Sequence, residues 1–379
     1  VESRMNPQAQ YGADVIMRAN YALEQGTEAI SMCVRKAVNE MLGSLAEDAG
    51  IRREDVFQVC VVGNTCMHHL FLGISPASLV HAPYTPAVSE RLVLNAGDYG
   101  LAVQERAELI MLSDIAGYVG ADTCGCLLAI RQDQQEEISL MIDIGTNGEM
   151  VLGNRERMVT CSTAAGPAFE GAKIECGMRG AAGAVDHVKY EDGKWNYTTV
   201  GNKPAVGLCG SGLIDLVAGL LDAGMLDENG VLRSGQEKQG VFILVLPERG
   251  GNERGVYLTQ KDLGEVQLAK AAIAAGIQML MERLGITEDD ICSVYIAGAF
   301  GNYMDPVSAG KIGLLPATLV KKVKPVGNAA GEGAKIALVN EKEMLEMDEL
   351  VRKIEFVELA ASADFQDHFI DELGFETGE

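Results

Sequence analysis

The chain has 379 residues, enough for two or more domains with a sizeable core, and its 47% hydrophobic content is ordinary for a globular protein. Its formal net charge is −23, which disfavours nucleic acid or an anionic membrane as the main partner because both need basic surface. No apolar run approaches the roughly 18 residues of a membrane-spanning helix, so none is predicted.

Nine cysteines are scattered along the chain without a Cys-x-x-Cys pair, and several lie inside apolar runs, as Cys60 does. This pattern predicts buried, reduced thiols in a cytoplasmic protein. The one close pair, Cys124 and Cys126, is interpreted as two helix-face residues rather than a metal site. The N-terminus lacks the pattern of a signal peptide, and the missing initiator Met suggests that an upstream segment was removed.

In chain order, the sequence predicts a helix over roughly Thr27–Leu45 and then a strand and a helix around Val59–Leu72. His68 and His69 open that second helix. We favour a helix N-terminus packed on a sheet and capped by Asn64 or Thr65 over a site near a phosphate or a partner. Strands and helices alternate in the rest of the chain, which predicts an α/β fold with covered sheets.

The polar run from residue 131 to 137 is the natural boundary between two halves, and it predicts a first lobe over 1–136 and a second over 137–379. The second lobe opens with a predicted β-hairpin with an Asn-Gly turn, in which an apolar strand ends at Asp143 and is followed by Gly145, Thr146, Asn147 and Gly148. Backbone amides of such a turn can hold a phosphate, and the acid can hold Mg²⁺ through water. An ordinary Asn-Gly hairpin is the open alternative.

Further along the chain, Thr163–Ala184 is predicted to be a long Gly/Ala-rich loop that contains Glu170. Loops of this length are often functional, but sequence does not choose between ordering on nucleotide or partner binding and a dimer contact. A ribbon over Tyr190–Thr199 and a helix opened by Gly210 follow. The glycines at this helix start suit either anion binding at the helix N-terminus or close packing of the helix on a sheet. A last long helix is predicted over Glu265–Leu284.

An internal repeat relates the two halves at a constant offset of 235 residues, with identical residues at Gly50/Gly285, Ile51/Ile286, Asp55/Asp290, Val59/Val294 and Gly63/Gly298. Each copy runs from a helix through a strand to a glycine turn, which indicates duplication. The hairpin precedes the second copy, whereas no matching hairpin signal precedes the first. We therefore expect the first half to be truncated at its N-terminus.

A set of motifs across nearly the whole chain resembles the ATP-dependent reductive activators of corrinoid proteins, which carry an actin-like ATPase domain of the sugar kinase and heat-shock chaperone type. The matching segments are Asn6–Gln8 with Tyr11–Val15, Val62–His69, Asp143–Glu149, Gly166–Gly171, Cys176–Arg179, Cys209–Asp215, Gln267–Lys270, Ala297–Asn302 and Gly327–Ala334. The resemblance implies a two-lobed actin-like ATPase fold and a protein that returns Co(II) corrinoid proteins to Co(I) by ATP-coupled electron transfer.

The same resemblance implies the roles of the site residues. Asp143–Glu149 would be the second phosphate loop, in which the catalytic residue Asp143 positions Mg²⁺ and the amides from Gly145 to Gly148 hold phosphates. The adenosine-side loop would comprise Gly298, Ala299, Phe300, Gly301 and Asn302, and Gln267 and Lys270 would lie at the nucleotide edge. For Lys270, a solvated helix lysine is the alternative. Ala116–Leu128 and Gly331–Ala337 would be interlobe helices whose small residues allow hinge motion.

ATP and Mg²⁺ are the implied cofactors, and a [2Fe–2S] cluster is expected in a domain upstream of this chain. The implied partner is the corrinoid protein of a methyltransferase system in one-carbon metabolism, and a homodimer stays open. Because the family's first phosphate loop is absent, a docking or dimerisation module without ATP turnover is the second hypothesis. An activator of 2-hydroxyacyl-CoA dehydratases is the third.

Overall fold

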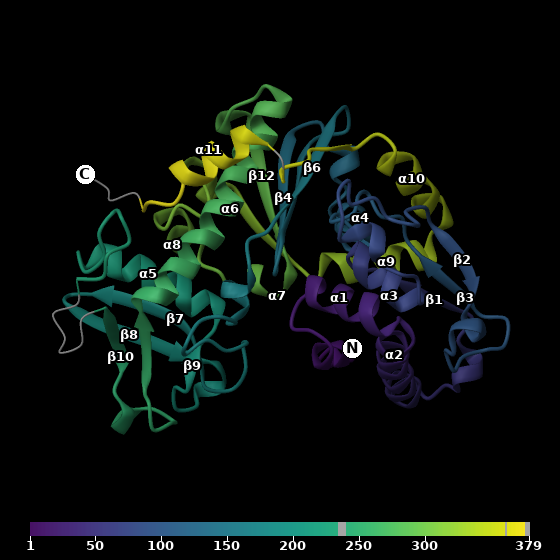
Figure 1. Cartoon of the computed structure of the whole chain (residues 1–379), viewed down its shortest axis with the longest axis horizontal. Coiled ribbons are helices and arrows are strands. Elements are labelled where there is room, and N and C mark those ends of the chain that lie inside the picture. Colours follow the sequence, from purple (N-terminus) through teal and green to yellow (C-terminus); the bar gives the residue numbers. More distant parts are fainter. Residues whose placement is uncertain (234–239, 361, 376–379) are drawn as a thin grey trace. The chain divides into compact units, whose positions relative to one another are not determined.

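The computed structural model describes residues 1–233, 240–360 and 362–375, and the chain forms two compact units. Unit 1 comprises Val1–Gln134 and Asn328–Phe356, and unit 2 comprises Gln135–Gly327 and Val357–Glu379. Figure 1 shows the course of the chain and the labels of its elements. The expected second lobe over 137–379 is therefore interrupted, because residues 328–356 fold into unit 1.

Unit 1 contains a three-stranded sheet with the order β1-β3-β2, in which β1 and β3 are parallel and β2 is antiparallel to β3. The strands are β1 (Gln58–Val61), β2 (Leu92–Asn95) and β3 (Glu108–Met111), and the two-residue strand β14 (Glu355–Phe356) ends the unit. Its helices are α1 (Val15–Gln25), α2 (Glu28–Ala49), α3 (Thr65–Leu72), α4 (Ala121–Ile130), α9 (Ala329–Val339) and α10 (Glu341–Val351).

Helices α4 and α9 pack directly on each other although about 200 residues separate them in the sequence. A Cβ on Gly333 would lie 1.9 Å from the carbonyl oxygen of Gly125, and one on Gly125 would lie 2.6 Å from Ala330 O. Only glycine permits this approach, so the two helices cross backbone to backbone. These are the helices expected to lie at the lobe interface, and their contact explains why residues 328–356 join unit 1.

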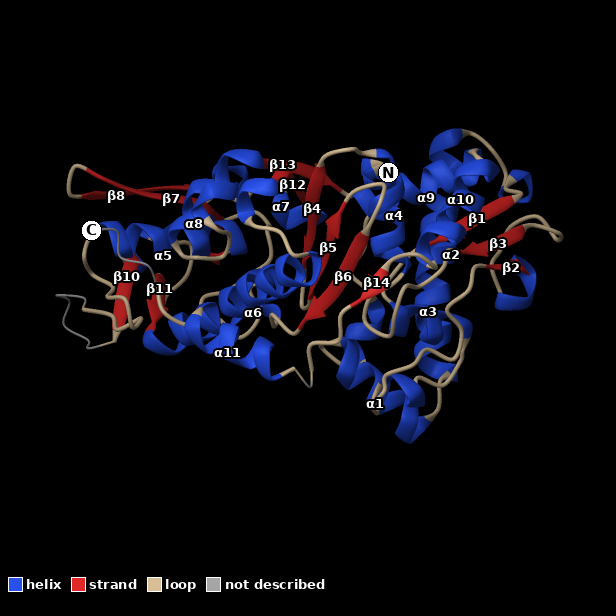
Figure 2. Cartoon of the chain, turned by 90° about the horizontal axis from the view of Figure 1, so that it is seen from above, coloured by secondary structure: helices blue, strands red, loops and turns tan. Residues whose placement is uncertain are grey.

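Unit 2 is built on a mixed sheet whose strands β13-β12-β4-β5-β6 are neighbours in that order. β13 (Val323–Gly327), β12 (Ile291–Ala297) and β4 (Ile138–Ile144) are parallel, whereas β5 (Gly148–Gly153) and β6 (Met158–Thr163) continue as an antiparallel meander. The apolar run of β4 is buried, as expected for a central strand. The long helix α6 (Gln260–Leu284) packs on β5 and β6. Figure 2 shows it beside these two strands.

A second part of unit 2 surrounds helix α5 (Gly210–Asp222), which packs on β7 and is almost wholly buried. The remaining elements are β7 (Ala184–Glu191), β8 (Lys194–Thr199), β9 (Gly207–Leu208), β10 (Val241–Val245), β11 (Val256–Thr259), α7 (Gly298–Gly301), α8 (Pro306–Lys311) and α11 (Ala363–Asp371). A Cβ on Gly212 would lie 2.2 Å from Val185 O. Close packing, the second of the two interpretations of this glycine-rich helix start, is therefore what the structure supports.

The internal repeat corresponds to matched local structure. Gly50 and Gly285 end α2 and α6 in the left-handed conformation, with φ of 67° and 70°. Asp55 then accepts a hydrogen bond from Arg52 N at 3.0 Å, and Asp290 accepts one from Thr287 N at 2.8 Å. The repeated glycine pair thus ends a helix, and the repeated aspartate pair caps the turn before a strand.

Within the described residues, no helix is both long and apolar enough to cross a membrane.

Candidate functional site

The predicted hairpin is present, but its turn differs from the predicted one. β4 and β5 pair antiparallel with Ile144 opposite Gly148, so the turn consists of three residues, Gly145, Thr146 and Asn147. The amide of Gly145 donates to Asn147 O at 2.9 Å and so faces into the turn. The prediction of an Asn-Gly turn is therefore wrong, because Gly148 is the first residue of β5.

Packing explains the glycine at position 148. A Cβ there would lie 2.9 Å from Thr163 Oγ1 and 3.2 Å from Ile273 Cγ1. Gly148 therefore lets α6 approach the start of β5 closely. Sequence reasoning assigned this residue to phosphate binding, but its environment is a buried helix–sheet contact.

Asp143 and Gly298 lie beside each other at the carboxyl ends of two adjacent parallel strands. Ala297 of β12 is in register with Asp143 of β4. Gly298 has φ of 85°, and a Cβ on it would lie 3.0 Å from Asp143 Oδ1. Both the left-handed backbone and this approach favour glycine. The structure thus brings together two loops that lie 155 residues apart in the sequence, at the edge where open α/β sheets bind ligands.

The carboxyl group of Asp143 is perturbed by its surroundings. Burial raises the pKa of Asp143 to about 6, and the nearby negative charge of Glu170 contributes to this rise. A carboxylate with an elevated pKa gains from a cation that neutralises it. The loop geometry and this pKa together support a binding role for Asp143.

The loop after β12 forms the short helix α7, which ends at Asn302. The ring of Phe300 stacks on that of Phe169 with a centroid separation of 5.7 Å and an interplanar angle of 15°. A Cβ on Gly301 would lie 2.5 Å from Ile296 Cγ2, so this glycine also has a packing role. Asn302 is exposed, and the side chain of Ala299 is outside the described structure.

Thr146, at the tip of the hairpin, is held by the loop that follows β6. Its hydroxyl donates to the Glu170 carboxylate, and its carbonyl accepts from Gly166 N at 2.8 Å. Sequence reasoning singled out Glu170 within this loop but gave it no partner. A hydrogen bond across 24 residues has no periodic signal, so only the fold reveals it.

Gln267 and Lys270 lie on α6 beneath the C-terminal segment Leu373–Phe375. Gln267 Nε2 donates to Leu373 O at 2.9 Å, Lys270 Nζ donates to Gly374 O, and the same ammonium lies 5.4 Å from the centroid of the Phe375 ring. Lys270 is 1% exposed, so the alternative of a solvated helix lysine is wrong. A nucleotide-edge role for Gln267 and Lys270 stays a prediction. It requires that the hydrogen bonds from these side chains to residues 373 and 374 break.

In unit 1, His68 and His69 adopt the structural arrangement favoured from sequence. Asn64 caps α3 by accepting from Met67 N at 2.9 Å. His69 Nδ1 lies 2.8 Å from Thr65 O, and His68 Nδ1 lies 3.3 Å from Asp114 Oδ1. Both imidazoles are buried, and they face different partners.

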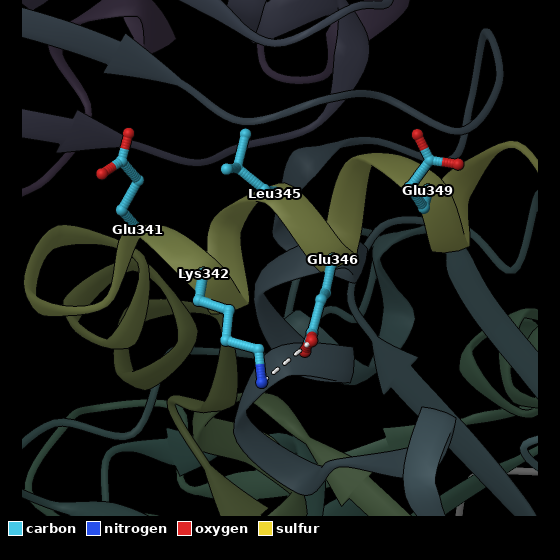
Figure 3. Close-up of a pocket in the computed structure, with 5 residues that line it drawn as sticks. All are labelled: Glu341, Lys342, Leu345, Glu346 and Glu349. Atoms are coloured by element: carbon cyan, nitrogen blue, oxygen red, sulfur yellow. Dashed lines mark ion pairs between the residues drawn. The ribbon is translucent and has the colours of Figure 1, made fainter.

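A shallow hollow on α10, also in unit 1, is lined by residues of this one helix. They are Glu341, Lys342, Leu345, Glu346 and Glu349, and Figure 3 shows Lys342 and Glu346 reaching toward each other. Their ion pair measures 3.4 Å and is largely exposed. This is a solvated helix face, and exposed pairs of this kind contribute little to stability.

The residues around Asp143 fit a nucleotide-bound Mg²⁺ better than a metal held by protein alone. Across the described part of the chain, no three His, Cys, Asp or Glu side chains converge on a common metal position. Mg²⁺ in nucleotide sites uses one or two carboxylates, several waters and the phosphates themselves. Asp143 with Glu170 nearby, beside a glycine turn that allows close backbone approach, matches that donor set.

Comparison with known families divides the chain near the break between the units. Residues 137–379 match the family described as the C-terminal domain of RACo, the ASKHA domain. Residues 1–135 match the RACo middle region. An actin-like ATPase fold, expected from the motif set, is confirmed by the first match.

Individual relatives agree with these matches. The chain is 34% identical over 385 residues to the corrinoid activation enzyme RamQ of Eubacterium limosum, covering 97% of this chain and 65% of that protein. It is 26% identical over 399 residues to the [Co(II) methylated amine-specific corrinoid protein] reductase of Methanosarcina barkeri, covering 97% and 71%.

A solved structure, that of a reductive activator for corrinoid, iron–sulfur protein, matches with a TM-score of 0.88 and 37% identity. The match covers 98% of this chain and 61% of that one, so the chain spans about two thirds of the length of these relatives. The family matches cover both units of the sequence, and the chain belongs to the RACo family, with the RACo middle region followed by the ASKHA domain.

Proposed function

We propose that this chain is the ATPase module of a reductive activator that returns Co(II) corrinoid proteins to Co(I) by ATP-coupled electron transfer. The observation that best supports this proposal is the close approach of Gly298 to Asp143 at the ends of β12 and β4, in a chain of the RACo family. The relatives named above act on corrinoid proteins, which supports this substrate class over 2-hydroxyacyl-CoA dehydratases.

In this proposal Asp143 orients Mg²⁺ through water, and the turn amides of Thr146 and Asn147 donate to phosphate oxygens. We do not assign this role to the amide of Gly145, which donates to Asn147 O. The Gly298–Asn302 loop borders the adenosine. Bound Mg²⁺–ATP would supply the free energy for an uphill reduction, and the residues of this chain would bind and orient it.

The electron donor in this proposal is an iron–sulfur cluster, of the [2Fe–2S] type, carried by another part of the complete protein. The partner is the corrinoid protein of a methyltransferase system, and a homodimer is one arrangement in which the module could work. A cytoplasmic location is supported by the nine free cysteines, since reduced thiols are typical of that compartment.

Calorimetry of the chain with Mg²⁺–ATP tests the proposal. We expect a dissociation constant in the micromolar range, on the order of −8 kcal/mol of binding free energy, and a loss of at least tenfold in Asp143→Asn. With the complete protein, conversion of a Co(II) corrinoid protein to Co(I), followed by absorbance, should require ATP and fail in the same variant. No binding heat from a folded wild-type chain would instead favour a module that only docks the corrinoid protein.

A further inference from the structure

The start of the loop between β6 and β7 contacts both the β4–β5 hairpin and helix α7 of unit 2. Gly166 N donates to Thr146 O at 2.8 Å, and the turn of 3₁₀ helix Pro167–Glu170 follows immediately. Phe169 is 3% exposed and stacks on Phe300 of α7. The chain at this point thus contacts both the hairpin tip and the adenosine-side loop, so the position of residue 170 is determined by both.

Glu170, the last residue of that turn, is exposed, but its carboxylate is directed to the hairpin. It accepts a hydrogen bond from the hydroxyl of Thr146, three residues after Asp143, and its negative charge contributes to the raised pKa of Asp143. Two carboxylates beside a phosphate loop would weaken the binding of an anion by themselves. A hydrated divalent cation between them and the phosphates reverses that effect, because carboxylates, water and phosphate oxygens are its preferred ligands.

We infer that Glu170 is a positioning residue of the site, which holds the hydrated Mg²⁺ of the bound nucleotide together with Asp143. This inference rests on the proposed ATPase function and adds a second acid to it. Thr146 orients the Glu170 carboxylate, and the Phe169–Phe300 stack keeps the main chain in place. The Gly/Ala-rich loop, whose role sequence left open, would in its first part be a wall of the Mg²⁺–nucleotide site.

The test measures how strongly Mg²⁺ promotes ADP binding. Calorimetry of the full chain gives the dissociation constant of ADP in EDTA and in saturating Mg²⁺, and the ratio of the two is the Mg²⁺ effect. Glu170→Gln keeps an acceptor for the Thr146 hydroxyl but removes the charge. We expect it to reduce the Mg²⁺ effect by about tenfold while ADP binding in EDTA stays equal or tightens.

Glu175→Gln is the matched control. Glu175 is a carboxylate of the same loop, and it accepts a hydrogen bond from the Tyr257 hydroxyl at 3.1 Å instead of from the hairpin. We expect the wild-type Mg²⁺ effect in this variant. A reduced effect in both variants would indicate a general electrostatic contribution of the loop and would overturn the inference.

The remaining outcomes separate this inference from the proposed function. Wild-type binding of Mg²⁺–ADP with an unchanged Mg²⁺ effect in Glu170→Gln would overturn the role of Glu170 and leave the ATPase proposal standing. Equal tightening of ADP with and without Mg²⁺ would also overturn it, because Glu170 would then only repel phosphate. Failure of the wild-type chain to bind ADP at all would overturn the proposed function and this inference with it.

Discussion

At the scale of single residues, two carboxyl groups of unit 2 have opposite environments. Asp143 lies near the end of β4, and Asp290 directly precedes β12. Burial raises the pKa of Asp143 to about 6. The pKa of Asp290 is lowered, because its carboxylate accepts hydrogen bonds from the Thr287 amide and hydroxyl. The first group is costly to ionise in the folded chain, whereas ionisation of the second is favourable.

This contrast predicts opposite effects of neutralisation. For Asp143 the folded pKa lies above the unfolded one, so stability falls as pH rises from about 4 to about 6. Asp143→Asn should therefore raise the free energy of unfolding at pH 7.5, without nucleotide, by on the order of 1–2 kcal/mol, and the gain should vanish below about pH 4. Asp290→Asn should lower it. Urea denaturation at both pH values measures this, and destabilisation by Asp143→Asn at pH 7.5 would contradict it.

At the scale of elements, the repeated helix–strand–glycine unit is used differently in the two halves. Gly63 and Gly298 are equivalent positions of the repeat. Gly298 has φ of 85°, and a Cβ added to it would meet Asp143. Gly63 is outside the left-handed region, and its Cβ would lie an ordinary 3.8 Å from Met67 Cβ. The same position of the repeat thus favours glycine in unit 2 and has no such requirement in unit 1.

We therefore expect Gly298→Ala and Gly63→Ala to differ. Gly298→Ala should lower the free energy of unfolding by about 1–2 kcal/mol, because alanine resists positive φ and its methyl group crowds Asp143 Oδ1. It should also weaken Mg²⁺–ADP binding. Gly63→Ala should stay within about 0.5 kcal/mol of the wild type. Thermal unfolding and calorimetry of both variants measure this, and equal effects would show that the turn geometry does not distinguish the two positions.

At the scale of the whole molecule, unit 1 is assembled from two segments of the chain. Residues 328–356 return to it because α9 packs against α4 through Gly125 and Gly333. Folding of unit 1 therefore requires synthesis of the intervening part of unit 2. This discontinuity also makes the stability of α4 depend on residues that follow it by about 200 positions.

A methyl group at this crossing should act on both segments together. In Gly333→Ala the new Cβ would lie 1.9 Å from Gly125 O, and we expect a loss of about 2 kcal/mol or more. Amide hydrogen exchange should rise in 121–130 and 329–339 alike. The control is Gly264→Ala in α6, where a Cβ meets nothing within 4 Å and should stabilise by about 0.5–1 kcal/mol. Faster exchange in 329–339 alone would show that the two helices are not coupled.

The sequence by itself determined the features that depend on local periodicity and on short motifs. The α6 face of Val266, Ala269 and Ile273, the glycine caps of the repeat and the strand that carries Asp143 near its end are all present. The motif set also predicted the family correctly. These features are readable because a helix stripe, an αL cap and a buried strand each impose their pattern on neighbouring residues.

Only the tertiary structure decided which distant groups meet. It placed Gly298 against Asp143, gave Thr146 its partner Glu170, and covered Lys270 with residues 373–375. It also moved residues 328–356 into unit 1. Such contacts depend on strand order, register and backbone approach, which are set when the whole chain closes its core and leave no periodic trace in the sequence.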